Sequence, residues 1–253
     1  MRACIIAVLW LWAFTFSVAQ VTGVDAASEA LKENVLPRKI SDFAMTQGTL
    51  FDGLKSLSSG PVPFALGFEE TLREKFTDPA TLDPRFDLHL RNKTVGEILD
   101  ALCAADSRYA WSVDGSAINV YPRATIGDVS YLLNRRLVKL NLNRIADIDQ
   151  GLLAIAHQLP PPEEQLAHVQ MGGDSSYPPQ PWDASFQDLT VRQAINRLTA
   201  HMGPYACWVF HGSRDFRAFT FLRAGFHKEA ETGTKVQEII TPQSGRESVH
   251  ELH

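Results

Sequence analysis

Apolar residues recur along the chain with two periods, which predict helices and strands. Four apolar residues at helical spacing predict an amphipathic helix: Val95, Ile98, Leu99 and Leu102. From Tyr109 to Val113 apolar and polar residues alternate, which predicts a strand. Asp114 and Gly115 are typical of a two-residue hairpin turn, and a further alternating stretch begins at Ile118. The segment is therefore expected to fold as a helix followed by a hairpin.

This pattern recurs at a constant spacing of 96 residues. Segments 86–111 and 182–207 align without a gap. Seven residues are identical between them: Asp87, Thr94, Val95, Leu102, Ala104, Tyr109 and Ala110 recur as Asp183, Thr190, Val191, Leu198, Ala200, Tyr205 and Ala206. Self-similarity at a fixed spacing is the signature of a repeated structural unit. The sequence therefore predicts two tandem copies of one small module.

Each module is expected to contain two helices, because a second amphipathic segment precedes the first in both copies. These upstream helices are predicted at 49–57 and 147–155. All four helices follow a residue whose side-chain oxygen can accept from a free backbone amide, and these caps are Thr49, Thr94, Asp147 and Thr190. Further strands are predicted at 40–46, 62–66 and 137–142. The fold class is therefore α+β, with the two helices of each module packed against short, mostly antiparallel sheets.

The segments between these elements set the module boundaries. Prolines predict loop inserts at 69–84 and 160–181, and the polar composition after 223 predicts disorder. In chain order, the expected division is a signal peptide at 1–19, a linker at 20–36, a first module at 37–123, a linker at 124–134, a degenerate second module at 135–223 that contains the proline-rich insert 160–181, and a disordered tail at 224–253.

The first nineteen residues have the composition of a secretory signal. One positive charge, Arg2, precedes an apolar run that ends in the small residues Ser17 and Ala19. An uncleaved anchor is the alternative, but the run is shorter than the roughly 20 residues that a membrane-spanning helix needs. We therefore expect cleavage after Ala19, no membrane span in the mature chain, and a periplasmic or extracellular location in a bacterium.

The charge balance argues against a nucleic-acid partner. The chain has 24 lysines and arginines against 29 aspartates and glutamates. Phosphate binding needs a clustered basic surface, and the tight basic cluster Arg135 with Arg136 consists of two residues. Two adjacent arginines are typical of a solvated strand end, so no nucleic-acid binding is expected.

Two of the three cysteines, Cys103 and Cys207, lie after the predicted signal. An oxidising compartment permits a disulfide between them. Such a bridge requires their Cα atoms to lie within about 7 Å, which the sequence does not fix. The paired and the free states therefore both remain open.

No group of reactive residues predicts catalysis. The histidines are scattered without the short spacing of a metal site, so neither a metal nor another cofactor is expected. His201 and His211 lie on either side of Cys207, and a Cys–His pair can be nucleophilic. However, Cys207 occupies the place of Trp111 in the repeat, which indicates packing. Adjacent acids such as Glu69 and Glu70 are expected to be solvated loop residues. We predict that the protein is not an enzyme.

Part of the chain resembles a known family. The segment 40–121 is similar to the short N-terminal domain of secretins and TonB-dependent receptors, through the stretches 49–57, 62–66, 92–102, 109–113 and 118–120. The resemblance implies two helices between two small sheets and a periplasmic domain that contacts other envelope proteins. No pore or barrel is expected after the second copy, so the signalling role of such receptors is not implied.

Aromatic residues near the proline-rich insert are the candidate partner-binding residues: Tyr177, Trp182 and Phe186. Trp182 occupies the place of Phe86 in the repeat, so a role in the core is equally open. We expect a non-catalytic interaction module whose partner is another envelope protein, bound through sheet edges or the inserts. The alternative is a periplasmic binding protein that holds a small molecule or a cell-wall fragment in a cleft between the modules.

Overall fold

The computed structural model describes residues 22–71, 83–159, 167–172, 181–201, 206–212, 217–222, 224–228 and 235–239. The predicted signal peptide and Tyr177 lie outside the described residues. Among the helices that are described, none has the length and apolar character needed to cross a membrane.

Two halves of the chain contain the same order of elements. The first half consists of β1 (Lys39–Gly48), α3 (Leu50–Ser58), β2 (Ala65–Glu69), β3 (Phe86–Thr94), α4 (Val95–Ala105), β4 (Tyr109–Asp114) and β5 (Ala117–Pro122). The second half consists of β6 (Arg136–Ile145), α5 (Ile148–Ala156), β7 (Ala167–Gly172), β8 (Trp182–Thr190), α6 (Val191–Ala200), β9 (Cys207–Gly212) and β10 (Arg217–Leu222). The α+β class is confirmed, while the division into two separate modules stays a prediction.

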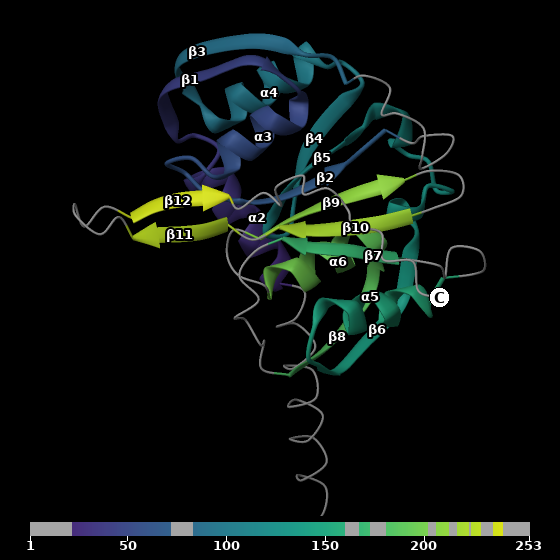
Figure 1. The fold of residues 1–253 in the computed structure, drawn as a ribbon. Coiled ribbons are helices and arrows are strands. Elements are labelled where there is room, and N and C mark those ends of the chain that lie inside the picture. Colours follow the sequence, from purple (N-terminus) through teal and green to yellow (C-terminus); the bar gives the residue numbers. More distant parts are fainter. Residues whose placement is uncertain are drawn as a thin grey trace, which may run out of the picture.

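The two halves share one six-stranded sheet with the strand order β4-β5-β2-β9-β10-β7. Strand β2 pairs in parallel with β5 on one side and with β9 of the second half on the other. Two further antiparallel sheets, β1 with β3 and β6 with β8, lie at the outside. Figure 1 shows the six strands across the middle of the molecule, with α3 and α4 above them and α5 and α6 below. The halves are therefore joined edge to edge and place their helices on opposite faces.

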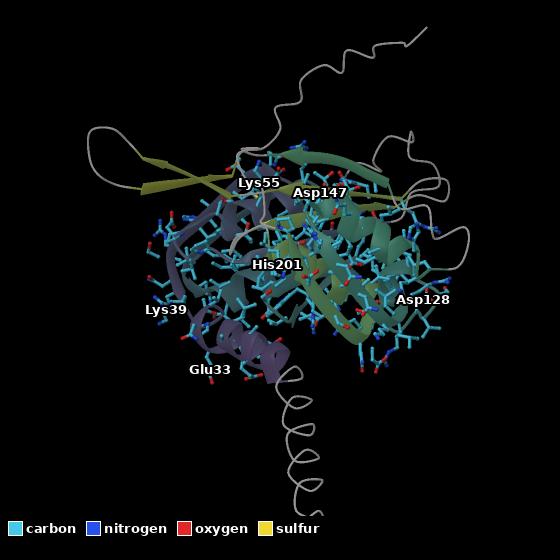
Figure 2. All side chains as sticks on the ribbon, turned by 90° about the horizontal axis from the view of Figure 1, so that it is seen from below. Glu33, Lys39, Lys55, Asp128, Asp147 and His201 are labelled. Atoms are coloured by element: carbon cyan, nitrogen blue, oxygen red, sulfur yellow. The ribbon has the colours of Figure 1, made fainter. Side chains whose placement is uncertain are left out.

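Alternation along β9 divides the apolar interior into two cores. Cys207 and Val209 pack with the buried residues of α3 and α4, whereas Trp208 and Phe210 pack with those of α5 and α6. Because successive side chains of a strand point to opposite faces, each face of the sheet belongs to the helices of one half. Figure 2 shows charged side chains such as Lys39 and Asp128 on the outside of this body.

The four predicted helix caps are confirmed. Thr49, Thr94 and Thr190 each accept from the backbone amide three residues on, and the side chain of that third residue accepts from the amide of the cap. Asp147 likewise accepts from the amide of Gln150, but the Gln150 side chain accepts from Ala146 instead. Each cap satisfies an amide that the helix itself leaves free.

Neither predicted linker is an irregular spacer. Residues 20–36 contain the helix α2 (Thr22–Asn34), which is rich in alanine, glutamate and lysine, and Leu31 packs against the first core. Residues 124–134 contain the end of η1 (Arg123–Thr125) and all of η2 (Leu132–Asn134). The side chain of Leu133 is fully buried there in the second core. Apolar side chains that reach a core thus override the polar appearance of both segments.

Strands occur where loops and disorder were predicted. The insert at 160–181 contains β7, because a parallel pairing with β10 is available to its residues. The tail at 224–253 contains the antiparallel pair β11 (Ala224–Lys228) and β12 (Lys235–Ile239), so the prediction of disorder is wrong for these ten residues. Phe226, Val236 and Ile239 favour strands despite their polar neighbours. The strand predicted at 62–66 begins later, as β2, and ends at Glu69.

Neither Cys103 nor Cys207 is part of a disulfide, so the bridge between them is not formed. Both thiols are buried in the first core. Burial raises the pKa of Cys103 to about 12 and that of Cys207 to about 11. A raised pKa favours the protonated thiol, which is the unreactive form.

We expect the two thiols to resist alkylation in the folded protein. At pH 8 a thiol with a pKa near 11 is ionised to about one part in a thousand, against about one part in four for an ordinary cysteine. Labelling by iodoacetamide, followed by mass spectrometry of the peptides that contain Cys103 and Cys207, is therefore expected to be at least about tenfold slower in buffer than in guanidinium. Equal rates in both solvents would contradict the buried positions.

Candidate functional site

A buried ion pair joins the two halves. Glu69, the last residue of β2, is fully buried, and its carboxylate accepts two hydrogen bonds from the guanidinium of Arg192 on α6. The Nη2–Oε2 distance is 3.1 Å. Because Gly67 and Glu69 alternate with Leu66 and Phe68 of the first core, Glu69 points to the face covered by α6. The prediction of a solvated Glu69 is therefore wrong.

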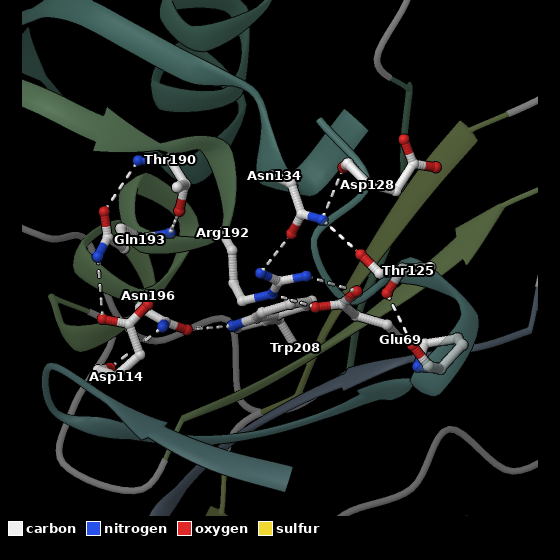
Figure 3. A network of polar contacts seen from close by, with 11 residues as sticks. Glu69, Asp114, Thr125, Asp128, Asn134, Thr190, Arg192, Gln193, Asn196 and Trp208 are labelled. Atoms are coloured by element: carbon white, nitrogen blue, oxygen red, sulfur yellow. Dashed lines mark hydrogen bonds and ion pairs between the residues drawn. The ribbon is translucent and has the colours of Figure 1, made fainter. Parts of the chain in front are cut away.

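The segment between the halves is attached to this pair. Arg192 also donates from Nη1 to the side-chain oxygen of Asn134 at 2.8 Å, and its guanidinium lies 5.0 Å from the centre of the Tyr121 ring. Asn134 in turn donates to the backbone oxygens of Thr125 and Asp128. Figure 3 shows Glu69 of β2 and Asn134 of the connecting segment both contacting Arg192 of α6.

Burial opposes the charge of the Glu69 carboxylate, and Arg192 compensates for it. Burial raises the pKa of Glu69, while the hydrogen bonds and charge of Arg192 act in the opposite direction. The Glu69 carboxylate also contributes to raising the pKa of Arg192 and of the buried Tyr131. A bidentate, largely desolvated pair of this kind fixes the orientation of the two groups.

A second group of hydrogen-bonded polar side chains connects β9, α6 and the turn after β4. The indole of Trp208 donates to Asn196 Oδ1 at 2.8 Å, and Asn196 Nδ2 donates to the backbone oxygen of Asp114 at 3.3 Å. Gln193 Nε2 donates to the carboxylate of Asp114 at 3.2 Å, while its oxygen accepts from the amide of Thr190. Gln193 therefore caps its own helix and holds the hairpin of the first half (Figure 3).

A pocket of about 250 Å³ lies beside this second group, between α2, the β4–β5 turn, β8 and α6. Phe186 on β8 forms part of its wall, and the guanidinium of Arg197 lies 4.6 Å from the centre of that ring. His201 lies at the end of α6 and stacks on Trp182 with 3.6 Å between ring centres. Figure 2 shows His201 near the middle of the molecule. The pocket thus has walls from both halves.

The structure brings two of the three candidate binding residues to this region. Phe186 lines the pocket, and Trp182 stacks on a residue that lines it. Both also pack partly against the second core, as Phe86 does against the first, so the role of Trp182 in packing is supported and its role in partner binding stays a prediction.

Sequence reasoning missed the two arginines of α6. At the repeat spacing, Arg192 and Arg197 occupy the places of Gly96 and Ala101. A long cation in place of a small residue was the available signal, because it marks a position where the second copy faces different surroundings from the first.

The Cys–His alternative has no geometric support. The Cys207 thiol is packed in the first core. His211 instead contacts Thr220 at 2.9 Å and the carboxylate of Glu70 at 3.0 Å. In the part of the chain that is described, no three potential metal ligands lie together.

No protein-family model, no curated protein and no solved structure matches this chain.

Proposed function

We propose that this chain is an exported, non-catalytic interaction protein of the bacterial cell envelope, and that it binds a partner protein by strand addition. The signal-like first nineteen residues and the resemblance to short N-terminal domains of secretins and TonB-dependent receptors support the location. The observation that carries the proposal is the edge-to-edge pairing of β2 with β9.

The two copies contribute strands at different positions in the element order to the junction within the shared sheet. By element order, β7 is the counterpart of β2, and β4 is the counterpart of β9. The junction of β2 with β9 therefore leaves one edge of each kind, β7 and β4, as the ends of the sheet. A strand at the end of a sheet has backbone groups that an added strand can pair with.

Helix α2 distinguishes the two ends. It packs against β4, and Ser28 Oγ donates to the backbone oxygen of Gly115 at 3.1 Å. Among the described residues, no strand pairs with β7 beyond β10. The geometry therefore favours β7 as the edge that receives a partner strand.

A pair of proline substitutions tests this edge. In a strand, amides of successive residues point to opposite sides, so one of Gln170→Pro and Met171→Pro removes an outward amide and the other an amide that faces β10. The outward variant is expected to keep its thermal midpoint and to lose the partner in cross-linking within the native envelope. The inward variant is expected to lower the midpoint.

The matched controls are Gln170→Ala and Met171→Ala, which keep both amides and are expected to keep the partner. Retention of the cross-linked partner by the proline variant with an unchanged midpoint would rule out strand addition at β7.

A further inference from the structure

The pocket between the halves contains a cation, the guanidinium of Arg197. Arg197 is half-buried on α6 and stacks on Phe186. In the described part of the chain, its guanidinium makes no hydrogen bond and no ion pair. Stacking holds the plane of a guanidinium and leaves its N–H groups at the edge, where they match the two oxygens of a carboxylate.

An anion from the other half faces the same pocket. Asp114 ends β4, and its carboxylate is oriented by the hydrogen bond from Gln193, while the turn it begins is held by Asn196 (Figure 3). The negative charge of Asp114 acts on Arg197 and counters the lowering of the Arg197 pKa by burial. Nevertheless, no ion pair joins these two described residues. The two opposite charges therefore both line the pocket without forming an ion pair with each other.

Small residues form part of the remaining wall, beside Gln193, Asn196 and His201. Ala27, Gly115, Ser116 and Ala200 line the pocket, so its volume is not filled by long side chains. A ligand of matching size is compact, and the wall is for the most part apolar, with a few polar groups that can fix the orientation of a ligand.

We propose that the pocket binds a small zwitterion, an amino acid or a short peptide, with its carboxylate on Arg197 and its ammonium group on Asp114. Such a ligand pairs both separated charges at once and contacts both halves of the chain. This binding site is independent of the strand addition proposed for β7, because it lies between α2, β8 and α6.

Isothermal titration calorimetry on the whole chain with charge-blocked analogues tests the proposal without any substitution. The zwitterions are L-alanine and L-alanyl-L-alanine. Their relative affinities report the length of ligand that the pocket accommodates. The analogues are N-acetyl-L-alanyl-L-alanine, which lacks the ammonium group, and L-alanyl-L-alaninamide, which lacks the carboxylate. Saturable binding of a zwitterion and at least about tenfold weaker binding of both analogues are expected, since each loses a charge-assisted contact.

Two substitutions locate the contacts. Asp114→Asn keeps the size of the side chain, and Arg197→Gln replaces the cation by a shorter neutral amide. Each substitution is expected to weaken binding of the zwitterion at least about tenfold. Lys139→Gln, on the exposed surface of β6, removes one positive charge elsewhere and is expected to leave the affinity unchanged. Absence of saturable binding of both zwitterions, equal affinity of a blocked analogue, or an unchanged affinity in folded Arg197→Gln would overturn the proposal.

Discussion

Replacing Arg192 by alanine is expected to lower the free energy of unfolding by about 3–5 kcal/mol, since the substitution leaves the carboxylate of Glu69 buried without its partner. Urea unfolding monitored by circular dichroism measures this loss. The matched control is Arg197→Ala on the same helix, which breaks no ion pair and is expected to cost about 1 kcal/mol or less.

The loss of unfolding free energy in Arg192→Ala is expected to depend on pH. Without Arg192, burial raises the pKa of Glu69 with no charge to oppose it. A carboxyl whose pKa is higher in the folded than in the unfolded state binds its proton more tightly when folded. Its destabilising effect on the folded state is therefore smallest below the unfolded pKa and grows as the pH rises through the folded pKa. The difference in stability from the unsubstituted chain is therefore expected to be smaller at pH 5 than at pH 8.

Removing both charges separates the cost of an unpaired charge from the value of the pair. The double substitution Glu69→Leu with Arg192→Leu is expected to cost less than Arg192→Ala alone, because neither charge remains in the buried site. A double variant that is less stable than Arg192→Ala would contradict the view that the unpaired carboxylate dominates the loss.

Trp208→Ala is expected to lower the free energy of unfolding by about 3–5 kcal/mol. The ring is almost fully buried in the second core, and its indole N–H is the donor to Asn196. It also lies against Gly67 of β2, where an added Cβ would be 2.4 Å from the ring. The substitution therefore removes packing at the junction of β2 with β9 and leaves a buried acceptor without its donor.

Trp111→Ala is the matched control for Trp208→Ala. Trp111 lies on β4 at the end of the sheet and is only partly buried, and its indole donates to the exposed Asp100. We expect a smaller loss, about 1–2 kcal/mol, by urea unfolding. Equal losses in the two variants would indicate that the junction is no better packed than the sheet end.

Local signals in the sequence were sufficient for the four helices that begin at a predicted cap. A cap such as Thr94 and the apolar positions that follow it act within one or two turns of chain, so their effect can be predicted without the rest of the fold. The α+β class followed from these helices and from the alternation around Tyr109.

Pairing between distant segments could not be predicted in this way. Strand β7 is stabilised by β10, and Glu69 is buried because Arg192 reaches it across the sheet. Neither partner is near in sequence, so a proline-flanked insert and an acidic pair looked like solvated loops. The pocket has the same origin, since Asp114 and Arg197 belong to different copies of the repeat.

Amide hydrogen exchange along β2 tests the junction between the halves most directly. With β5 on one side and β9 on the other, successive amides of residues 66–69 are expected to point to different neighbours and to be hydrogen-bonded there. The account predicts slow exchange, resolved by nuclear magnetic resonance, at all four amides. If the halves were separate, β2 would be an edge strand, and fast exchange at alternate amides would contradict the shared sheet.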